Sequence, residues 1–326
     1  MKSIFQGGML AMAGWALVAS AAYAGDGYPD KPIKLVVPYP PGGIADTFSR
    51  ALAQNLSDQF KQPVLVENKP GANQIIGVET VLRAPADGYT LFLASMTSLA
   101  TNLGAYRELS YDPVKDFAPV SHLFASPLIL TVGTNTPVQT VDELVALAKE
   151  RPGELTYASL GDGGSLHLAG ELFGQAANID LLRVPYKGSV QALADVVGGS
   201  VTMIFDAGTT AIPQIQGGRA RALAVTSDTR LPGLPDVPTM AEAGYPTVDI
   251  GVWWGLAVRS GTPDAILATL NQAVVKALEN PAFAERFRGT GLSIQPSSLE
   301  DFTRFVSEEA RRWPRFMAEV GVVPLQ

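Results

Sequence analysis

A short predicted strand meets a long predicted helix in the stretch Val36-Val37-Pro38-Tyr39-Pro40-Pro41-Gly42-Gly43-Ile44-Ala45-Asp46. Residues 33–37 are mostly apolar and β-branched, which suits a strand buried in a parallel sheet. The prolines end this strand, and apolar residues then recur at every fourth position from Ile44 to Phe60, as on one face of a helix. This strand–turn–helix unit predicts an α/β fold.

The turn itself contains two adjacent glycines, Gly42 and Gly43, at the predicted start of the helix. A glycine has no Cβ and lets the backbone approach a ligand closely. The first N–H groups of a helix lack internal partners and carry the positive end of its dipole. The turn is therefore either a carboxylate or phosphate site or a plain connection in which Asp46 favours the first helical turn.

Composition narrows the possible functions. The 326 residues include no cysteine and two histidines, and the formal net charge is −7. The lack of cysteine excludes disulfides and thiolate catalysis, and two histidines leave little to build a metal site from. An acidic chain without a basic run argues against a nucleic-acid partner. The length suffices for two medium domains or one large domain.

Residues 1–24 have the features of a secretory signal peptide. They contain one lysine, no acidic residue, an apolar run over residues 9–22, and Ala22-Tyr23-Ala24 before Gly25 as a cleavage signal. The alternative is an N-terminal membrane anchor, but a span needs about 20 apolar residues. We therefore expect an exported protein that begins at Gly25.

The strand–turn–helix theme returns in the second half of the chain, where a predicted strand at residues 155–159 leads into a glycine-rich turn and a helix from Ser165. Two long extended runs, 120–132 and 248–258, exceed the usual strand length of about 5–6 residues. They predict that the chain crosses into a second domain and returns. The expected division is domain 1 at residues 25–126 and 249–326, and domain 2 at residues 127–248.

Nine short blocks carry a family resemblance over most of the chain. In order they are YPDKP (28–32), VPYPPGG (37–43) with Asp46, VENKPGA (66–72), DGYTL (87–91), DFAPV (116–120), SLHLAGELF (165–173), VPYKG (184–188), RALAVT (221–226) and DVPTMAEAG (236–244). Together they resemble the Bug-type solute receptors, the extracytoplasmic substrate-binding components associated with tripartite tricarboxylate transporters. The resemblance implies a type II periplasmic-binding-protein fold, with two α/β domains joined by two crossing strands.

The resemblance also implies a function without covalent chemistry. It predicts a monomeric periplasmic receptor that closes on a small organic carboxylate and delivers it to the membrane components of such a transporter. No catalytic residue, cofactor, metal or nucleic acid is expected. The implied ligand-binding residues come from loops of both domains: Pro41, Gly42, Gly43, Asp46, Ser95, Thr97, Gly163, Gly164, Ser165, His167, Asp206 and Ala207.

Two departures from the family pattern bear on the ligand. Ile44 and Ala45 stand where the family often has a third glycine and a threonine. Residues 73–75 read Asn-Gln-Ile where Gly-Gly-Asn is common. These changes remove a hydroxyl and add bulk near the expected cleft, which is compatible with a more apolar acid, such as an aromatic one.

Single residues leave alternatives open. Ser165 and His167 could suggest a hydrolase, but the nucleophile-elbow pattern Gly-x-Ser-x-Gly fails at its last position. Asp206 could be a general base, the N-cap of the next helix or a carboxylate that senses the ligand. A receptor that signals to a sensor partner without import is a further alternative.

Two other features can be interpreted in either of two ways. Lys187 could bind a carboxylate or be solvated. Trp253 and Trp254 point to opposite faces of a predicted strand, so one could face the cleft, or both could only pack.

Overall fold

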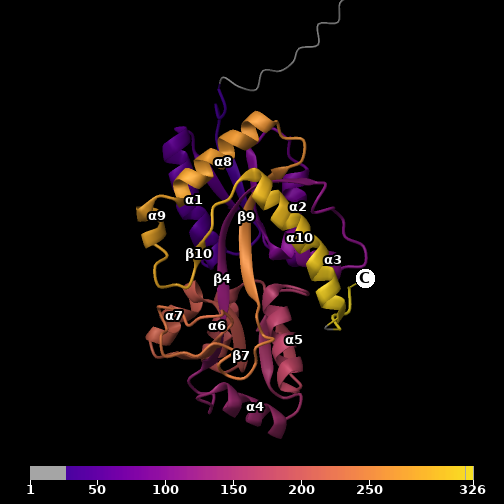
Figure 1. The fold of residues 1–326 in the computed structure, drawn as a ribbon, viewed down its shortest axis with the longest axis vertical. Helices are drawn as coiled ribbons and strands as arrows, with labels where there is room; N and C mark the ends of the chain where they lie inside the picture. The colour runs from indigo at the N-terminus through magenta and orange to yellow at the C-terminus, as the bar shows by residue number, and fades with distance from the viewer. Residues whose placement is uncertain (1–26, 320, 326) are drawn as a thin grey trace, which may run out of the picture.

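The computed structural model describes residues 27–319 and 321–325, so the predicted signal peptide at residues 1–24 lies outside the described part. The described strands form one sheet with the order β2-β1-β3-β9-β4-β7-β5-β6, and β8 and β10 pair with β4. Figure 1 shows this sheet running along the molecule, with helices on both of its faces.

The first group of strands begins with the predicted strand–turn–helix unit. Its strands are β1 (Ile33–Val37), β2 (Val64–Asn68), β3 (Thr90–Ser95), β9 (Gly251–Arg259) and the short β10 (Ser293–Ile294). The strand β1 pairs in parallel with β2 and β3, and β9 runs antiparallel to β3. The helices of this group are α1 (Ile44–Phe60), α2 (Ile75–Leu82), α3 (Asn102–Ala105), α8 (Asp264–Leu278), α9 (Pro281–Glu285) and α10 (Leu299–Glu319), with the short 3-10 helix η1 (Ala72–Gln74) and the π-helix η2 (Thr97–Thr101).

The second group of strands repeats the same unit. Its strands are β5 (Thr156–Ser159), β6 (Leu182–Pro185), β7 (Met203–Ala207) and β8 (Ala220–Val225). Its helices are α4 (Val141–Glu150), α5 (Ser165–Ala177), α6 (Ser189–Gly198) and α7 (Gly208–Gln216). In Figure 1, α5 lies on one side of this group and α6 and α7 lie on the other.

One long strand, β4 (Phe117–Gly133), belongs to both groups. Up to Pro127 it pairs with β9, and from Leu128 onward it pairs with β7 and β8. The return path reaches β9 at Gly251, a few residues after the predicted start of the second extended run. The change of partner lies beside the expected domain boundary at residues 126 and 127.

The core of the first group is aromatic where α1 meets the sheet. The Phe48 ring lies 4.0 Å from that of Phe124 on β4 and 5.1 Å from that of Phe283 on α9. All three side chains are buried, and burial of such side chains supplies most of the free energy that holds a helix on a sheet. This packing fixes the N terminus of α1 at the carboxyl end of β1.

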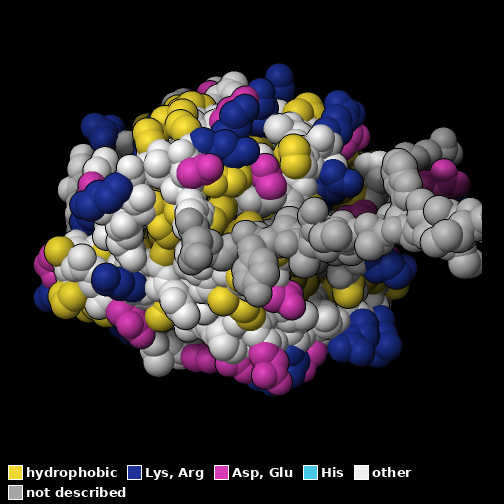
Figure 2. Space-filling model, turned by 90° about the horizontal axis from the view of Figure 1, so that it is seen from above, with side chains coloured by type: hydrophobic (Ala, Val, Ile, Leu, Met, Phe, Trp, Pro, Cys, Tyr) yellow, Lys and Arg dark blue, Asp and Glu magenta, His cyan; other side chains and the backbone are white. Residues whose placement is uncertain are grey.

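The surface carries both signs of charge. On the face seen from above, basic and acidic side chains are interspersed (Figure 2). Among residues 27–319 and 321–325, no helix is both long enough and apolar enough to cross a membrane.

Candidate functional site

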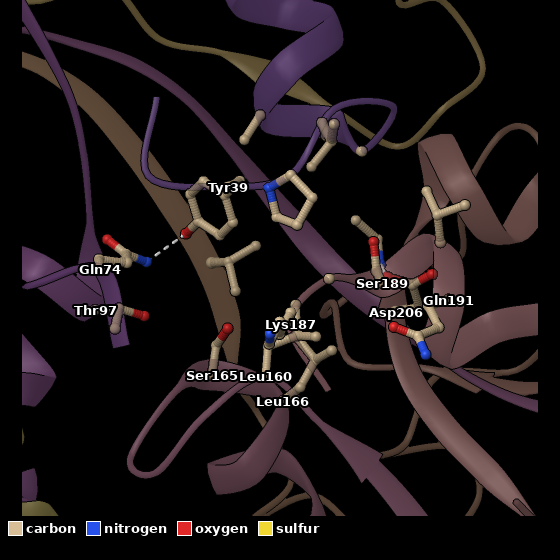
Figure 3. Close-up of a pocket in the computed structure, with 18 of the residues that line it drawn as sticks. Tyr39, Gln74, Thr97, Leu160, Ser165, Leu166, Lys187, Ser189, Gln191 and Asp206 are labelled. Atoms are coloured by element: carbon tan, nitrogen blue, oxygen red, sulfur yellow. Dashed lines mark hydrogen bonds between the residues drawn. The ribbon is translucent and has the colours of Figure 1, made fainter. Parts of the chain in front are cut away.

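A cavity of about 380 Å³ lies between the two groups of strands, where the carboxyl ends of β1 and β7 face each other. Most of its wall is apolar, with a few polar side chains (Figure 3). The lining residues of the first group are Tyr39, Pro40, Pro41, Gly43, Ile44, Ala45, Gln74, Thr97, Val252 and Trp254. Those from Leu128 to Ala207 are Leu128, Leu160, Ser165, Leu166, Lys187, Gly188, Ser189, Val190, Gln191, Ala194, Asp206 and Ala207.

Four helices begin at this cavity. Residues at the starts of α1, α5, α6 and α7 line the wall, and no N-cap side chain of the four hydrogen-bonds to its helix. The N-cap residues are Gly43, Gly164, Gly188 and Ala207, whose side chains are absent or a single methyl group. The first N–H groups of these helices therefore lack a side-chain acceptor and present a positive potential to the cavity.

The two glycines of the first turn serve different purposes. Gly43 lines the cavity, whereas Gly42 adopts φ +95° and donates its N–H to Asp46 Oδ2 over 3.0 Å. The left-handed conformation favours glycine at this position. Gly42 is thus required for the shape of the turn and is not part of the cavity wall.

Asp46 also lies outside the wall, although it was predicted to bind the ligand. Its carboxylate is buried, pairs with Arg50 over 2.9 Å and accepts a hydrogen bond from Asn68 Nδ2 over 2.9 Å. Burial alone would raise the pKa of Asp46, but hydrogen bonds from Arg50, Asn68 and the Gly42 N–H outweigh it and hold the pKa below its usual value. Asp46 therefore supports the turn from behind.

In the loop after β3, one of the two predicted ligand-binding residues lines the cavity and the other lies behind the wall. Thr97 lines the cavity, while Ser95 is buried beneath it. Ser95 donates its hydroxyl proton to Gln74 Oε1 over 2.9 Å, and Gln74 Nε2 donates to the Tyr39 hydroxyl over 2.7 Å (Figure 3). Ser95 thus acts on the cavity through Gln74.

In the second group, Ser165 lines the cavity and His167 does not. His167 is buried, and its Nδ1 accepts the N–H of Gly163 over 2.9 Å. Gly163 and Gly164 shape the turn before α5 and are not in the wall. Because Nδ1 is occupied by backbone and Nε2 lies 3.5 Å from Glu171, His167 forms no catalytic pair with Ser165.

Asp206 and Ala207 both line the cavity, at the end of β7. The Asp206 carboxyl is almost fully buried and accepts hydrogen bonds from Thr210 Oγ1 over 2.6 Å and from the Ala207 N–H over 2.9 Å. Burial raises the pKa of Asp206 to about 6, although hydrogen bonds from Thr210, the Ala207 backbone and Ser189 oppose the rise. Asp206 thus changes charge close to neutral pH.

Several wall residues were not predicted as ligand contacts. Ser189 and Gln191 start α6, and the only signal for them was the glycine that ends the block at residues 184–188. Tyr39 and Gln74 approach each other across 35 positions of sequence, which no local pattern shows. Within the described residues of the wall, Lys187 is the one cationic side chain.

The two tryptophans of β9 separate as the alternation of a strand requires. Trp254 lines the cavity and stacks on Phe124, with ring centroids 4.6 Å apart. Trp253 packs on the opposite side, where its Nε1 donates to Glu309 of α10 over 2.8 Å. Residues 27–319 and 321–325 contain no group of three or more His, Cys, Asp or Glu side chains that could hold a metal ion.

Comparison with known proteins decides the family. The model of the tripartite tricarboxylate transporter family receptor matches residues 48–322. The chain belongs to this receptor family. The Bug-type resemblance is therefore confirmed.

Relatives and solved structures agree over nearly the whole chain. Protein BugT of Bordetella pertussis is 36% identical over 313 residues, which cover 96% of this chain and 95% of BugT. The structure of R. palustris Rpa4515 with adipate is 34% identical, with a TM-score of 0.88 over 92% of this chain and all of the other. The periplasmic binding protein BugD is 32% identical, with a TM-score of 0.87 over 91% of this chain and 100% of BugD.

These likenesses confirm the predicted α/β fold of periplasmic binding proteins. The proteins of this receptor family are periplasmic and bind solutes, and neither the relatives nor the structural neighbours are enzymes. The function of the cavity therefore depends on which solute its wall can bind.

Proposed function

We propose that the protein is a periplasmic receptor that binds a small organic carboxylate in this cavity and delivers it to the membrane components of a tripartite tricarboxylate transporter. The observation that carries the proposal is the convergence of four helix N termini, none capped by its own N-cap side chain, on one cavity. Hydrogen bonds from N–H groups to a carboxylate are charge-assisted, and enclosure away from water strengthens them.

Local donors have to attract the anion, because the overall charge of the chain is negative. The helix starts at Gly43 and Ser189 lie close together, since a methyl group on Gly43 would be 3.7 Å from the Ser189 hydroxyl. Lys187 supplies the one positive side chain of the described wall. A carboxylate near these groups would meet backbone donors, a hydroxyl and a cation.

The body of the ligand should be apolar. Pro40, Leu128, Leu160, Leu166 and the ring of Trp254 face the cavity between its polar side chains. Each Å² of apolar surface that ligand binding removes from water contributes about 25 cal/mol to the binding free energy. This wall supports an aliphatic or aromatic acid more than a compact, many-charged acid such as citrate.

We also propose that the two groups of strands act as the two expected domains, residues 25–126 with 249–326 and residues 127–248, after removal of a signal peptide at residues 1–24. The cavity wall draws on both, so their separation would open it. Pro40 lies against Gly188, where a Cβ would be 2.9 Å from the proline ring. This tight contact suits a closed receptor.

A thermal-shift screen of residues 25–326 tests the proposal. The protein is first unfolded and refolded to release any bound ligand, then mixed with aliphatic and aromatic mono-, di- and tricarboxylates. A ligand at 100 times its dissociation constant should stabilise the protein by about 2.7 kcal/mol. Each acid has a matched alcohol as its control, such as benzyl alcohol for benzoate.

We expect acids to raise the unfolding temperature and their alcohols to leave it unchanged. Equal shifts from an acid and its alcohol, or no shift from any acid, would contradict a carboxylate site. Uptake of the active acid by cells with and without the receptor gene then tests delivery. Unchanged uptake would favour a sensor.

A further inference from the structure

Most polar residues of the cavity lie in two groups, and Ser165 and Lys187 lie between them (Figure 3). One contains Ser189 and Asp206, whose side chains interact, with Gly43 beside them. The other contains Tyr39, Gln74 and Thr97. Figure 3 shows the two groups on opposite sides, with Leu160 and Leu166 between them. A ligand that spans the cavity would meet both groups.

The second group is connected by a chain of hydrogen bonds that runs from the Thr97 backbone to the Tyr39 hydroxyl. The Thr97 backbone N–H donates to Ser95 Oγ over 3.2 Å, Ser95 donates to Gln74 Oε1 over 2.9 Å, and Gln74 Nε2 donates to the Tyr39 oxygen over 2.7 Å. The Gln74 amide turns its Oε1 atom to Ser95 and its Nε2 atom to Tyr39. Because the amide nitrogen can only donate, Tyr39 receives a hydrogen bond at the end of the chain.

The Tyr39 hydroxyl is left with its own proton to donate. Burial raises the pKa of Tyr39, and the Ser95 hydroxyl and the indole N–H of Trp254 lie close enough to its oxygen to oppose that rise, but neither makes a hydrogen bond of normal geometry with it. Within residues 27–319 and 321–325, the one hydrogen bond of normal geometry at the Tyr39 hydroxyl is the bond that it accepts from Gln74. The Tyr39 proton can therefore turn toward an acceptor in the cavity.

The backbone before α2 adopts a strained conformation that holds Gln74 in place. Ala72, Asn73 and Gln74 all have left-handed φ angles, +44°, +47° and +74°, which non-glycine residues rarely adopt. Asn73 and Asn102 stabilise this turn through two mutual hydrogen bonds of 2.6 and 3.0 Å. A glycine at position 74 would be unstrained, but would provide no amide to Tyr39.

We propose that Tyr39, positioned by Gln74, recognises an uncharged oxygen acceptor at the end of the ligand remote from its carboxylate. This inference rests on the carboxylate proposal above and adds the chemistry of the other end. Tyr39, Gln74 and Thr97 carry no charge, and a second carboxylate buried against neutral donors would lose more hydration than they return. The ligand is thus a monocarboxylate with an apolar body and a terminal amide, ketone or similar group.

Three probes of equal chain length test the inference with the refolded wild-type protein. Hexanoate has no polar far end, adipamate has a neutral amide, and adipate has a second carboxylate. We expect adipamate to bind about five-fold more tightly than hexanoate, as for one neutral hydrogen bond, and more tightly than adipate. Benzoate, 4-carbamoylbenzoate and terephthalate form the matched aromatic series.

Two variants assign the effect to the named residues. Tyr39→Phe should reduce the affinity for adipamate to that for hexanoate and leave hexanoate unchanged. Gln74→Gly relieves the left-handed backbone strain but leaves the buried Ser95 hydroxyl without its acceptor, so the unfolding temperature should change little, while the affinity for adipamate alone should fall. In the double variant Tyr39→Phe with Gln74→Gly, adipamate should bind no more weakly than in Tyr39→Phe, because Gln74 acts through Tyr39.

The outcomes separate this inference from the proposed function. If Tyr39→Phe weakens hexanoate and adipamate equally, Tyr39 has only a structural role and the inference fails. If adipate binds more tightly than adipamate, the far end of the ligand is charged and the inference also fails. In both cases the carboxylate proposal survives. If none of the six probes binds while another acid of the thermal-shift screen does, the inference is contradicted and the carboxylate proposal survives. If no acid binds, both proposals are contradicted.

Discussion

The side-chain amide of Asn73 donates a hydrogen bond to the backbone carbonyl of Asp162 over 2.6 Å. This bond joins the turn after β2 to the turn after β5, beside the cavity. Gly161 makes room for it, because a Cβ at that position would lie 2.5 Å from the Asn73 Oδ1 atom. The contact between the two groups of strands is therefore specific and can be removed by one substitution.

Asn73→Gly should weaken ligand binding. Glycine keeps the left-handed φ of +47° without strain and removes the side-chain hydrogen bonds to Asp162 and to Asn102. If closure depends on this bond, loss of about 1 kcal/mol should lower the affinity for a carboxylate probe about five-fold, measured by calorimetry. Asn178→Gly, another left-handed position that is remote from the cavity wall, is the matched control. Equal affinity in Asn73→Gly and the wild type would exclude a role in closure.

The Asp206 carboxyl should make binding depend on pH. Its pKa of about 6 lies above the usual value, so the folded protein favours the protonated form, and Asp206 becomes anionic as the pH rises through about 6. A carboxylate ligand should therefore bind more tightly at pH 5 than at pH 7.5, after correction for the ionisation of the probe. Asp206→Asn should bind almost equally at both pH values. A pH dependence that persists in this variant would assign the effect to another group.

The two glycines of the first turn should respond differently to valine. Gly43 has φ −80°, which any residue adopts, so Gly43→Val should fold normally and fill the cavity beside Ser189, with a loss of affinity of tenfold or more. Gly42 has φ +95° and lies outside the wall, so Gly42→Val should mainly lower the free energy of unfolding, by about 1–3 kcal/mol. Denaturant unfolding and ligand titration of both variants test the division. Equal losses of stability would contradict it.

His167 should matter for stability and not for the ligand. His167→Ala leaves the buried Gly163 N–H without its acceptor, which should cost about 1–3 kcal/mol in the free energy of unfolding. Ligand affinity should stay within about two-fold of the wild type, since His167 is not in the wall. Ser165→Ala, which changes a wall residue, should show the reverse pattern, with an affinity loss of about five-fold. A large loss of affinity in His167→Ala would show that His167 contributes to ligand binding after all.

The fold was largely predictable because its main signals are local. The alternation of buried strands, glycine turns and amphipathic helices places α1 at Ile44–Phe60, as the four-residue spacing predicted. The length of the extended run that forms β4 predicted that the chain continues from one group of strands into the next. These patterns follow from burial and backbone geometry, which a sequence shows directly.

The site was predictable only to the level of loops. Each predicted loop does reach the cavity, but within a loop the sequence does not show which polar side chain faces inward. Asp46, Ser95 and His167 all turn away from the wall to satisfy buried backbone or side-chain donors and acceptors. A polar residue beside a glycine turn can hold either a ligand or the turn itself, and only the surrounding packing decides between the two.

The single strand β4 has a consequence for protein engineering. The chain leaves the first group of strands at Pro127 and returns at Gly251, and these two residues are partners in adjacent antiparallel strands. The intervening segment, residues 128–250, thus begins and ends at neighbouring points, and we call it the cassette. Exchange of this cassette between two members of the family would transplant Ser165, Lys187, Ser189 and Asp206 together and leave Tyr39 and Gln74 behind. Chimeras with a new pairing of ligand ends could be assembled in this way, without redesign of either wall.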